Sequence, residues 1–432
     1  MRQIGQSKRL PTKNCKVKKG GYMIVKKYIK DFENLGFGLF VHFGIYSVLG
    51  AGEWVKYLRG LSDEEYYPLY KIFNPDKDWA KNLTKTAKSA GCKYITLTTR
   101  HHDGFSLFDV CGLNEFDAPH GCGRDLVREF VDACHEEDII PFFYHTLWDW
   151  HEDSYRTDFK EYLKYLRKSV EILCKNYGKI GGIWFDGMWE NSDADWEEDA
   201  LYATIRKYQP EAMIINNTGM NARGALGNIE LDSVTFERGK PQSINLSDSP
   251  KYIASEMCEV LGDHWGYAKE DLNFKAPAQI IRQLAECRRY GSNLLLNIGP
   301  KADGSLRTID TAVLEILGEW VTYYDEAIHL PKPTGIEIQD KPDDFVLQNE
   351  GDYYLFCFGL PMSSDPNVAL FTEAFYEDTF MFEHEVESIT WMDNNAEVRF
   401  EQKDGRLTVY TVPFEYGRNL VVRVAKIKTI ER

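Results

Sequence analysis

Three carboxylates stand at the ends of apolar runs, and a pair of them in the right place could cleave a glycosidic bond. Asp186 ends the run Gly182-Ile-Trp-Phe-Asp, and Glu237 and Glu256 end two later runs. Hydrolysis of a glycoside with retention uses two carboxylates about 5–5.5 Å apart. One stays ionised as the nucleophile, and the other is held protonated to assist the leaving group. Asp186 suits the nucleophile, and either Glu237 or Glu256 could be the acid/base.

Further polar side chains follow the other apolar runs. They are His42, Glu53, Trp54, His101, His102, Tyr144, His145, Asn217 and Asn297. A polar group at nearly every such position is hard to explain as a set of loop caps. Hydrogen-bond donors, aromatic faces and carboxylates together are what a polyhydroxylated pyranose needs, because aromatic rings pack on the apolar face of the sugar.

Three of these residues, His42, His101 and His102, have a competing interpretation as metal ligands. Adjacent histidines on a strand point to opposite faces, so this pair is a poor chelate. A structural role in the core is a second alternative, and hydrogen bonding to sugar hydroxyls is the favoured one. The nine cysteines are scattered without a CxxC pair, which predicts neither a disulfide framework nor a zinc site.

The elements that must position these residues alternate between strands and helices. Eight apolar runs have the character of buried strands: 37–44, 94–99, 139–145, 182–187, 212–217, 233–237, 251–256 and 293–299. Helical spacing is found over 78–90, 124–135, 159–177, 201–208, 276–290 and 308–329. The alternation predicts an α/β fold, a (β/α)8-like barrel over residues 23–332, with its catalytic face at the carboxyl ends of the strands. No clear helices are predicted between the fifth and seventh strands.

A different pattern begins after Pro331 and Pro333, where short strand-like runs replace the alternation. The runs are 353–358, 368–375, 387–391, 397–400, 407–412 and 420–424. They predict a C-terminal β-sandwich over residues 335–432. At the other end, the first 30 residues hold ten Lys and Arg and no Asp or Glu, and residues 1–22 are expected to be a flexible lead-in.

Composition narrows the class of partner. The formal net charge of −16 argues against binding to nucleic acid and against adhesion to anionic membranes. No stretch approaches the roughly 18 apolar residues of a spanning helix, and the N-terminal region lacks the apolar core of a secretory signal. A cytoplasmic location is therefore expected, and the oligomeric state is left open.

Several of the segments resemble the signature motifs of one enzyme family. Phe37-Gly-Leu-Phe-Val-His-Phe-Gly-Ile-Tyr-Ser-Val48, followed by Gly52-Glu-Trp54, is similar to the opening motif of the α-L-fucosidases, glycoside hydrolase family 29. Later matches are Tyr94–Phe105, Gly123–Asp125, Gly182–Gly187, Ser255–Cys258 with Trp265–Tyr267, and Asn293–Gly304. They occur in the order of the family and together cover roughly residues 35–325.

The resemblance implies a barrel with a C-terminal β-sandwich, exo-acting and retaining release of terminal α-L-fucose from a glycan, and no metal or other cofactor. Asp186 matches the family's nucleophile, and Trp265 matches an aromatic position beside the fucose methyl. The residues that match contacts to the fucose hydroxyls and ring are His42, Glu53, Trp54, His101, His102 and Tyr144.

The acid/base varies in position across the family. Glu237 lies where the family usually places it and is favoured, and Glu256 is the alternative. Asn216-Asn217-Thr218 stands where many members carry Asn-Asp-Arg, so Arg223 is the candidate for the missing sugar-contacting arginine.

The residues leave two other functions open. One is a catalytically inactive fucose-binding protein, and the other is a retaining glycosidase for a related sugar. A fucosylated glycan is the expected partner, and Trp148, Trp150 and Trp189 are expected to shape the side of the site that receives the aglycone.

Overall fold

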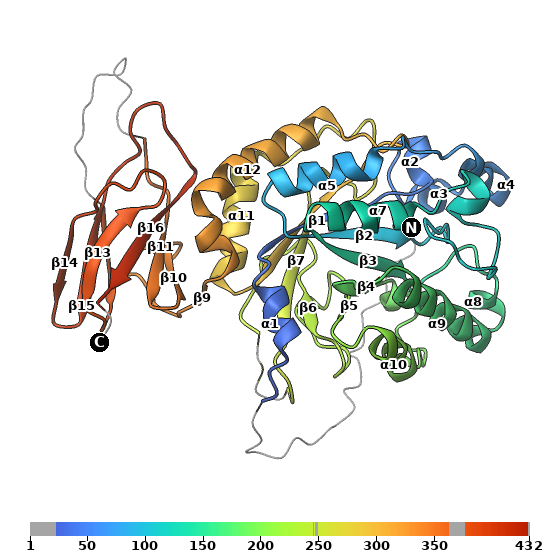
Figure 1. Cartoon of the computed structure of the whole chain (residues 1–432), viewed down its shortest axis with the longest axis horizontal. Coiled ribbons are helices and arrows are strands. Elements are labelled where there is room, and N and C mark those ends of the chain that lie inside the picture. Colours follow the sequence, from blue (N-terminus) through green and yellow to red (C-terminus); the bar gives the residue numbers. More distant parts are fainter. Residues whose placement is uncertain (1–22, 245, 247–248, 363–375, 431–432) are drawn as a thin grey trace.

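The computed structural model describes residues 23–244, 246, 249–362 and 376–430. Two predictions from the sequence, the lead-in over residues 1–22 and the strand over 368–375, fall outside these residues. The described chain forms a barrel and a smaller pair of sheets, which lies beside the barrel helices α11 and α12 (Figure 1).

Eight parallel strands close into a barrel in sequence order, and the first strand pairs with the last. The strands are β1 (Phe37–Val41), β2 (Tyr94–Arg100), β3 (Ile140–Thr146), β4 (Gly182–Asp186), β5 (Met213–Asn216), β6 (Ser233–Thr235), β7 (Ala254–Val260) and β8 (Asn293–Ile298). Their residues are almost all buried, as expected of strands covered on both faces. The predicted barrel is thus confirmed.

One strand is displaced from its predicted place. The run expected over 251–256 begins three residues later and continues to Val260, so Glu256 lies inside the strand and not at its end. Lys251 stays below the strand because its ammonium group binds the buried carboxylate of Asp232 at 2.8 Å.

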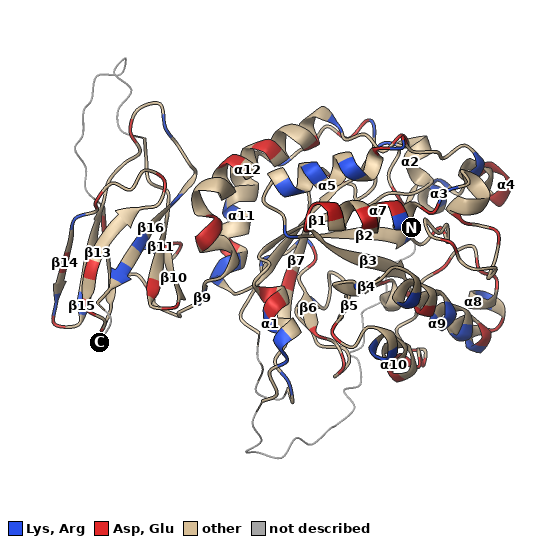
Figure 2. Ribbon diagram, viewed as in Figure 1, with Lys and Arg blue, Asp and Glu red and all other residues tan. Residues whose placement is uncertain are grey.

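The long helices pack around the outside of the barrel. They are α5 (Trp79–Ser89), α7 (Leu126–Glu136), α9 (Phe159–Asn176), α10 (Glu198–Tyr208), α11 (Pro277–Arg289) and α12 (Thr308–His329). Charged residues are prominent on these outer helices, on α5, α9 and α12 for example (Figure 2). Between β5 and β7 the described residues form no helix, in agreement with the sequence.

Shorter helices occupy the loops that follow the strands. They are α2 (Tyr46–Leu49), α3 (Val55–Arg59), α4 (Asp63–Tyr66), η1 (Tyr67–Lys71), α6 (Ala118–Gly121), α8 (Ser154–Thr157) and η2 (Met188–Asn191). None of the helices in the part of the chain that the structure describes is both long and apolar enough to cross a membrane.

A helix that the sequence did not predict, α1 (Lys27–Glu33), closes the amino-terminal end of the barrel. The ring of Phe32 lies 5.6 Å from the ring of Tyr94 and 5.6 Å from that of Phe142, both of which point into the barrel. Ile29 joins the same buried cluster. The amino-terminal end of the barrel is therefore filled by a packed core. The interior is accessible only from the carboxyl-terminal end of the strands.

The C-terminal part consists of two antiparallel sheets. A five-stranded sheet has the order β13-β16-β11-β10-β9, and a three-stranded sheet has the order β12-β15-β14. The strands are β9 (Lys332–Pro333), β10 (Phe345–Asn349), β11 (Asp352–Phe358), β12 (Tyr376–Met381), β13 (Val386–Trp391), β14 (Phe400–Lys403), β15 (Arg406–Thr411) and β16 (Val422–Thr429). The sequence missed β9, β10 and β12 and placed β14 three residues early.

Alternation along β11 explains how this part packs on both sides. Tyr354 and Phe356 join the core shared with the barrel helices, and Leu355 and Cys357 join the core between the two sheets. The indole nitrogen of Trp320 on α12 also donates to the carbonyl oxygen of Val422 at 3.1 Å. The sheets therefore pack on the outside of the barrel helices and contribute no residue to the cavity described below.

Candidate active site

A cavity lies at the carboxyl ends of the barrel strands. Its lining residues are Phe40, His42, Trp54, His101, His102, Tyr144, Trp184, Asp186, Trp189, Asn217, Glu237, Cys258 and Trp265. Eight of the eleven site residues proposed from the sequence are among them. The other three, Glu53, Arg223 and Glu256, lie outside the lining.

Asp186 ends β4 and receives three hydrogen bonds. Tyr144 donates its hydroxyl to Oδ2 at 3.0 Å, and Trp189 and Asn217 each donate a side-chain N–H to Oδ1 at 3.1 Å. His102 Nε2 lies 3.6 Å from Oδ2. Burial by itself raises the pKa of this carboxyl, but His102, Trp189 and Tyr144 outweigh it and hold the pKa below its usual value. Asp186 is therefore ionised.

Glu237 follows β6 and has the opposite electrostatic character. Burial and the negative charge of Asp186 raise the pKa of Glu237, against the hydrogen bond from Asn217 and the charge of Arg223. Two neighbouring carboxyls whose pKa values are pushed apart can serve as an ionised nucleophile and a protonated acid.

Asn217 joins the two carboxylates. Its Nδ2 lies 3.1 Å from Asp186 Oδ1 and 2.8 Å from Glu237 Oε2. The two oxygens are consequently at most about 5.9 Å apart, the sum of these two lengths. The backbone N–H of Gly219 donates to Asn217 Oδ1 at 3.1 Å, and so does the hydroxyl of Thr235. These donors fix which side of the amide faces the carboxylates.

His42 is a neutral hydrogen-bonding group in the cavity wall. Burial lowers the pKa of His42 to about 3. The amide of Asn297 donates Nδ2–H to the carbonyl oxygen of Trp265 at 2.7 Å, so its Oδ1 faces His42 Nδ1 at 2.6 Å. Nδ1 therefore carries the proton and Nε2 is left as an acceptor. The same amide connects His42 to the loop of Trp265, whose ring lies 5.2 Å from the imidazole.

His101 and His102 differ in their partners. His102 Nδ1 lies 2.7 Å from Thr146 Oγ1, and the threonine hydroxyl is directed at the carbonyl of Trp148, so His102 is the donor. His101 stacks on Tyr144 with the rings 5.5 Å apart, and its buried Nδ1 has no hydrogen-bond partner among the described residues. Among those residues, the group whose possible ligand atoms lie close enough together to hold a metal ion is elsewhere, in the C-terminal part, and consists of Asp344, Cys357 and Asp378.

Glu256 points into the barrel below the cavity. Tyr94 donates its hydroxyl to one carboxyl oxygen at 2.5 Å, and Trp184 donates its indole N–H to the other at 2.9 Å. Burial raises the pKa of Glu256 to about 7. Because both oxygens are occupied and the side chain does not line the cavity, Glu256 is poorly placed to reach a substrate.

The other two predicted residues, Glu53 and Arg223, hydrogen-bond to backbone groups of loops next to the cavity. Glu53 accepts the backbone N–H of Gly266 at 2.7 Å and so braces the loop that carries Trp265. Arg223 is exposed, and its guanidinium group donates to the carbonyl oxygens of Glu237 and Arg238.

Tryptophan rings form the wall beside Asp186. The ring of Trp54 lies 5.6 Å from Trp148, 5.5 Å from Trp150 and 6.3 Å from Trp189. The sequence placed Trp189 with the aglycone, and its bond to Asp186 also makes it a partner of that carboxylate.

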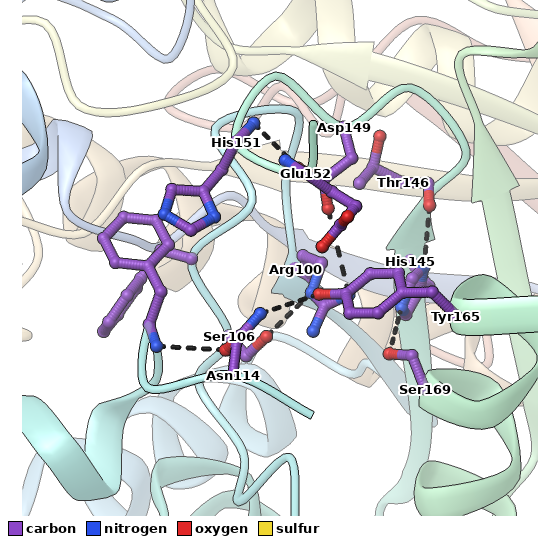
Figure 3. A network of polar contacts seen from close by, with 12 residues as sticks. Arg100, Ser106, Asn114, His145, Thr146, Asp149, His151, Glu152, Tyr165 and Ser169 are labelled. Carbon is purple, nitrogen blue, oxygen red and sulfur yellow. Dashed lines mark hydrogen bonds and ion pairs between the residues drawn. The ribbon is translucent and has the colours of Figure 1, made fainter. Parts of the chain in front are cut away.

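A buried arginine supports the loop that bears Trp148 and Trp150 (Figure 3). Arg100 donates Nε–H to the hydroxyl of Ser106 at 2.7 Å, and its Nη1 lies 3.9 Å from Asp149 Oδ2. Asp149 Oδ1 in turn accepts the backbone N–H groups of His151 and Glu152, at 2.9 and 3.0 Å. Next to this turn Gly104 has φ +80°, and a Cβ there would lie 2.5 Å from Asp149 Oδ1.

A family model described as Alpha-L-fucosidase matches residues 14–326. The chain belongs to this family. It is a glycoside hydrolase, and the resemblance found in the sequence motifs is confirmed.

Relatives and solved structures agree with this assignment. The chain is 30% identical to mouse tissue alpha-L-fucosidase over 344 residues, which cover 71% of this chain and 72% of the relative. It is 27% identical to human plasma alpha-L-fucosidase, over 69% of this chain and 68% of the relative. The structure of alpha-L-fucosidase isoenzyme 1 from Paenibacillus thiaminolyticus matches with a TM-score of 0.79 and 27% identity, over 94% of this chain and 99% of that one.

A more distant structure supports the fold alone. The alpha-L-fucosidase of Bacteroides thetaiotaomicron has a TM-score of 0.80 at 23% identity, over 98% of both chains. An alpha-L-fucosidase from the same organism has also been solved as a trapped covalent intermediate in complex with 2-fluoro-fucosyl fluoride.

The sequence did not assign three of the lining residues to the site, namely Phe40, Trp184 and Cys258, and it gave Trp189 and Asn217 no contact with a carboxylate. Phe40, Trp184 and Cys258 belong to strands, where every second side chain points into the barrel, so strand registers would have suggested them. Asn217 was noted as a polar residue at a strand end, but its bonds to two carboxylates depend on loops that only the fold brings together.

Proposed function

We propose that this protein is an exo-acting, retaining α-L-fucosidase that releases terminal α-L-fucose from glycans. The observation that carries the proposal is the shared amide of Asn217, which limits Asp186 Oδ1 and Glu237 Oε2 to about 5.9 Å. Retaining pairs stand about 5–5.5 Å apart, and inverting pairs leave roughly 6.5–9.5 Å for a water molecule.

The two carboxyls would act in two displacements. In the first, Asp186 forms a bond to the anomeric carbon while the bond to the aglycone oxygen breaks, and Glu237 gives that oxygen its proton. In the second, Glu237 takes a proton from water, and the hydroxide attacks the anomeric carbon and displaces Asp186. The lowered pKa of Asp186 and the raised pKa of Glu237 match these two starting states.

The remaining lining suits a single deoxy sugar. His42 offers an acceptor and His102 lies beside Asp186, so both can bond to hydroxyls near the reacting carbon. Phe40 and Trp265, with their rings 5.9 Å apart, give an apolar corner for a methyl group.

The test is azide rescue on an aryl α-L-fucoside. Asp186→Gly with azide is expected to yield the β-fucosyl azide, because azide replaces the missing nucleophile. Glu237→Ala is expected to yield the α-fucosyl azide, because azide then attacks the covalent intermediate from the leaving-group side. Glu256→Gln should need no azide.

Three results would change the proposal. Rescue of a Glu256 variant in place of the Glu237 variant would exchange the roles of the two glutamates. Binding of fucose by the wild type without hydrolysis of any fucoside would leave a binding protein. Faster hydrolysis of the matching galactoside would assign a related sugar.

A further inference from the structure

Two exposed arginines are neighbours of Glu237: Arg238 follows it in the chain, and Arg223 hydrogen-bonds to its backbone carbonyl. Arg223 donates Nε–H to the backbone carbonyl of Glu237 at 2.5 Å and Nη2–H to that of Arg238 at 3.4 Å. Gly239 leaves room for it, because a Cβ there would lie 2.6 Å from Arg223 Cδ. The guanidinium group is therefore held against the segment that carries Glu237.

Arg238 is held from the other side. Its backbone N–H donates to the carbonyl of Cys258, a cavity residue, at 2.9 Å. Its Nη1 donates to the carbonyl of Asp263 at 3.3 Å, on the loop that leads to Trp265. Arg238 has φ +47°, a left-handed conformation that a side chain rarely adopts, and this turns the chain sharply just after Glu237.

The guanidinium groups of both arginines donate to backbone carbonyls. Within the described part of the chain, neither guanidinium group forms an ion pair with a carboxylate, although the protein has a net charge of −16. Both side chains are exposed. Both also lower the pKa of Glu237, so their fields reach the site of proton transfer.

The position of the aglycone follows from the chemistry of the proposed function, on which this inference rests. A general acid must come within about 2.6–3.2 Å of the oxygen that it protonates. The sugar that carries the fucose therefore begins at Glu237, beside the two arginines. Guanidinium groups bind sulfate and carboxylate oxygens with paired N–H bonds.

We propose that Arg223 and Arg238 form an aglycone subsite for an anionic glycan, in which the sugar that carries the fucose bears a sulfate ester or a carboxylate. Asp186 and Glu237 perform the reaction, and the two arginines select the leaving group.

The experiment compares matched pairs of substrates. One pair is α-L-fucosyl-N-acetylglucosamine and its 6-O-sulfated form, and the other is an α-L-fucosyl glucoside and the corresponding glucuronide. The ratio of kcat/KM, anionic over neutral, is expected to be about ten or more, the effect of one charge-assisted hydrogen bond. A larger ratio for the sulfated pair would indicate a sulfate ester, and a larger ratio for the glucuronide pair would indicate a carboxylate. The ratio should fall in 0.5 M NaCl, because salt screens exposed charges.

The variants are Arg223→Gln, Arg238→Gln and the double variant, with Lys240→Ala as the matched control. Lys240 is a neighbouring exposed cation whose ammonium group lies 3.7 Å from Glu286. The double variant should bring the ratio close to one, and Lys240→Ala should leave it unchanged. If the double variant does not fold, Arg238→Gln and the salt dependence of the wild type give the same test.

The outcomes separate the two proposals. Equal hydrolysis of charged and neutral substrates by the wild type, or a ratio that the double variant leaves intact, would overturn the subsite and keep the fucosidase. No hydrolysis of any fucoside would overturn the fucosidase and the subsite together.

Discussion

Asn217 donates to Glu237 from the same nitrogen that reaches Asp186, at 2.8 and 3.1 Å. One amide thus bridges the two carboxylates, and its hydrogen bond lowers the pKa of Glu237. Many members of the family carry aspartate in the corresponding Asn-Asp-Arg motif, and a third carboxylate at this place would act in the opposite direction.

Asn217→Asp is expected to raise the pKa of Glu237, because a donor is lost and a negative charge is added. The alkaline limb of the kcat/KM profile, where Glu237 loses its proton, should move to higher pH. The maximal rate should fall roughly tenfold to a hundredfold, on the scale of lost electrostatic stabilisation. Asn217→Ala removes the donor without adding charge, so its limb should move less. An unshifted limb in both variants would show that Asn217 does not tune Glu237.

Tyr144→Phe tests the other carboxylate. The hydroxyl of Tyr144 bonds to Asp186 and lowers its pKa, so its loss should raise that pKa. Asp186 acts when ionised, and the acid limb of kcat/KM should therefore move to higher pH, by about one unit for one hydrogen bond to a charged group. The alkaline limb should move little. A rate loss with both limbs in place would assign Tyr144 to substrate contact alone.

Glu256→Gln should reveal a cost of stability at neutral pH. The folded protein holds the pKa of Glu256 at about 7, above its usual value of 4.5, so the unfolded chain releases this proton first. The stability that this residue contributes is full below pH 4.5 and is lost as pH rises toward 7, by up to about 3 kcal/mol. Urea unfolding at pH 4.5 and 7.5 should show a larger decline for the wild type than for Glu256→Gln. Parallel declines would contradict the raised pKa.

Asp149→Ala should destabilise the protein by about 3 kcal/mol, because Arg100 would remain buried without its carboxylate. The turn at His151 and Glu152 would also lose its acceptor. Asp153→Ala is the matched control, since its side chain in the same loop is 90% exposed. Urea unfolding of both variants measures the difference. Equal stability would show that the Arg100 network does not support the tryptophan loop.

Periodicity predicted most of the barrel because its strands are buried on both faces and stand out as apolar runs. It failed where a tertiary contact decides the outcome. The run at 251–256 has the composition of a strand, yet Asp232 holds Lys251 outside it. Helix α1 has seven residues and no side-chain cap, and the barrel floor on which Phe32 packs stabilises it.

The sequence predicts part of the candidate site, because the carboxyl ends of all the strands lie on the same face of the barrel. That rule brought His42, Tyr144 and Asp186 together. It could not rank Glu237 above Glu256, because a shift of a few residues decides whether a side chain ends a strand or fills the barrel. The bonds of Asn217 to residues 31 and 20 positions away are a property of folded loops.

The floor of the barrel has a consequence for synthesis on the ribosome. Helix α1 is made early, yet the residues it contacts come late: Tyr28 bonds to Asp232, and Arg288 bonds to the carbonyl of Glu33. Strand β1 likewise cannot complete its pairing until β8, which ends at Ile298, has been synthesised. At about 5–20 residues per second, the first strand stays unpaired on one edge for roughly 13–50 s. During this time the nascent chain exposes a β edge, and a chaperone that covers β1 would raise the yield of folded enzyme.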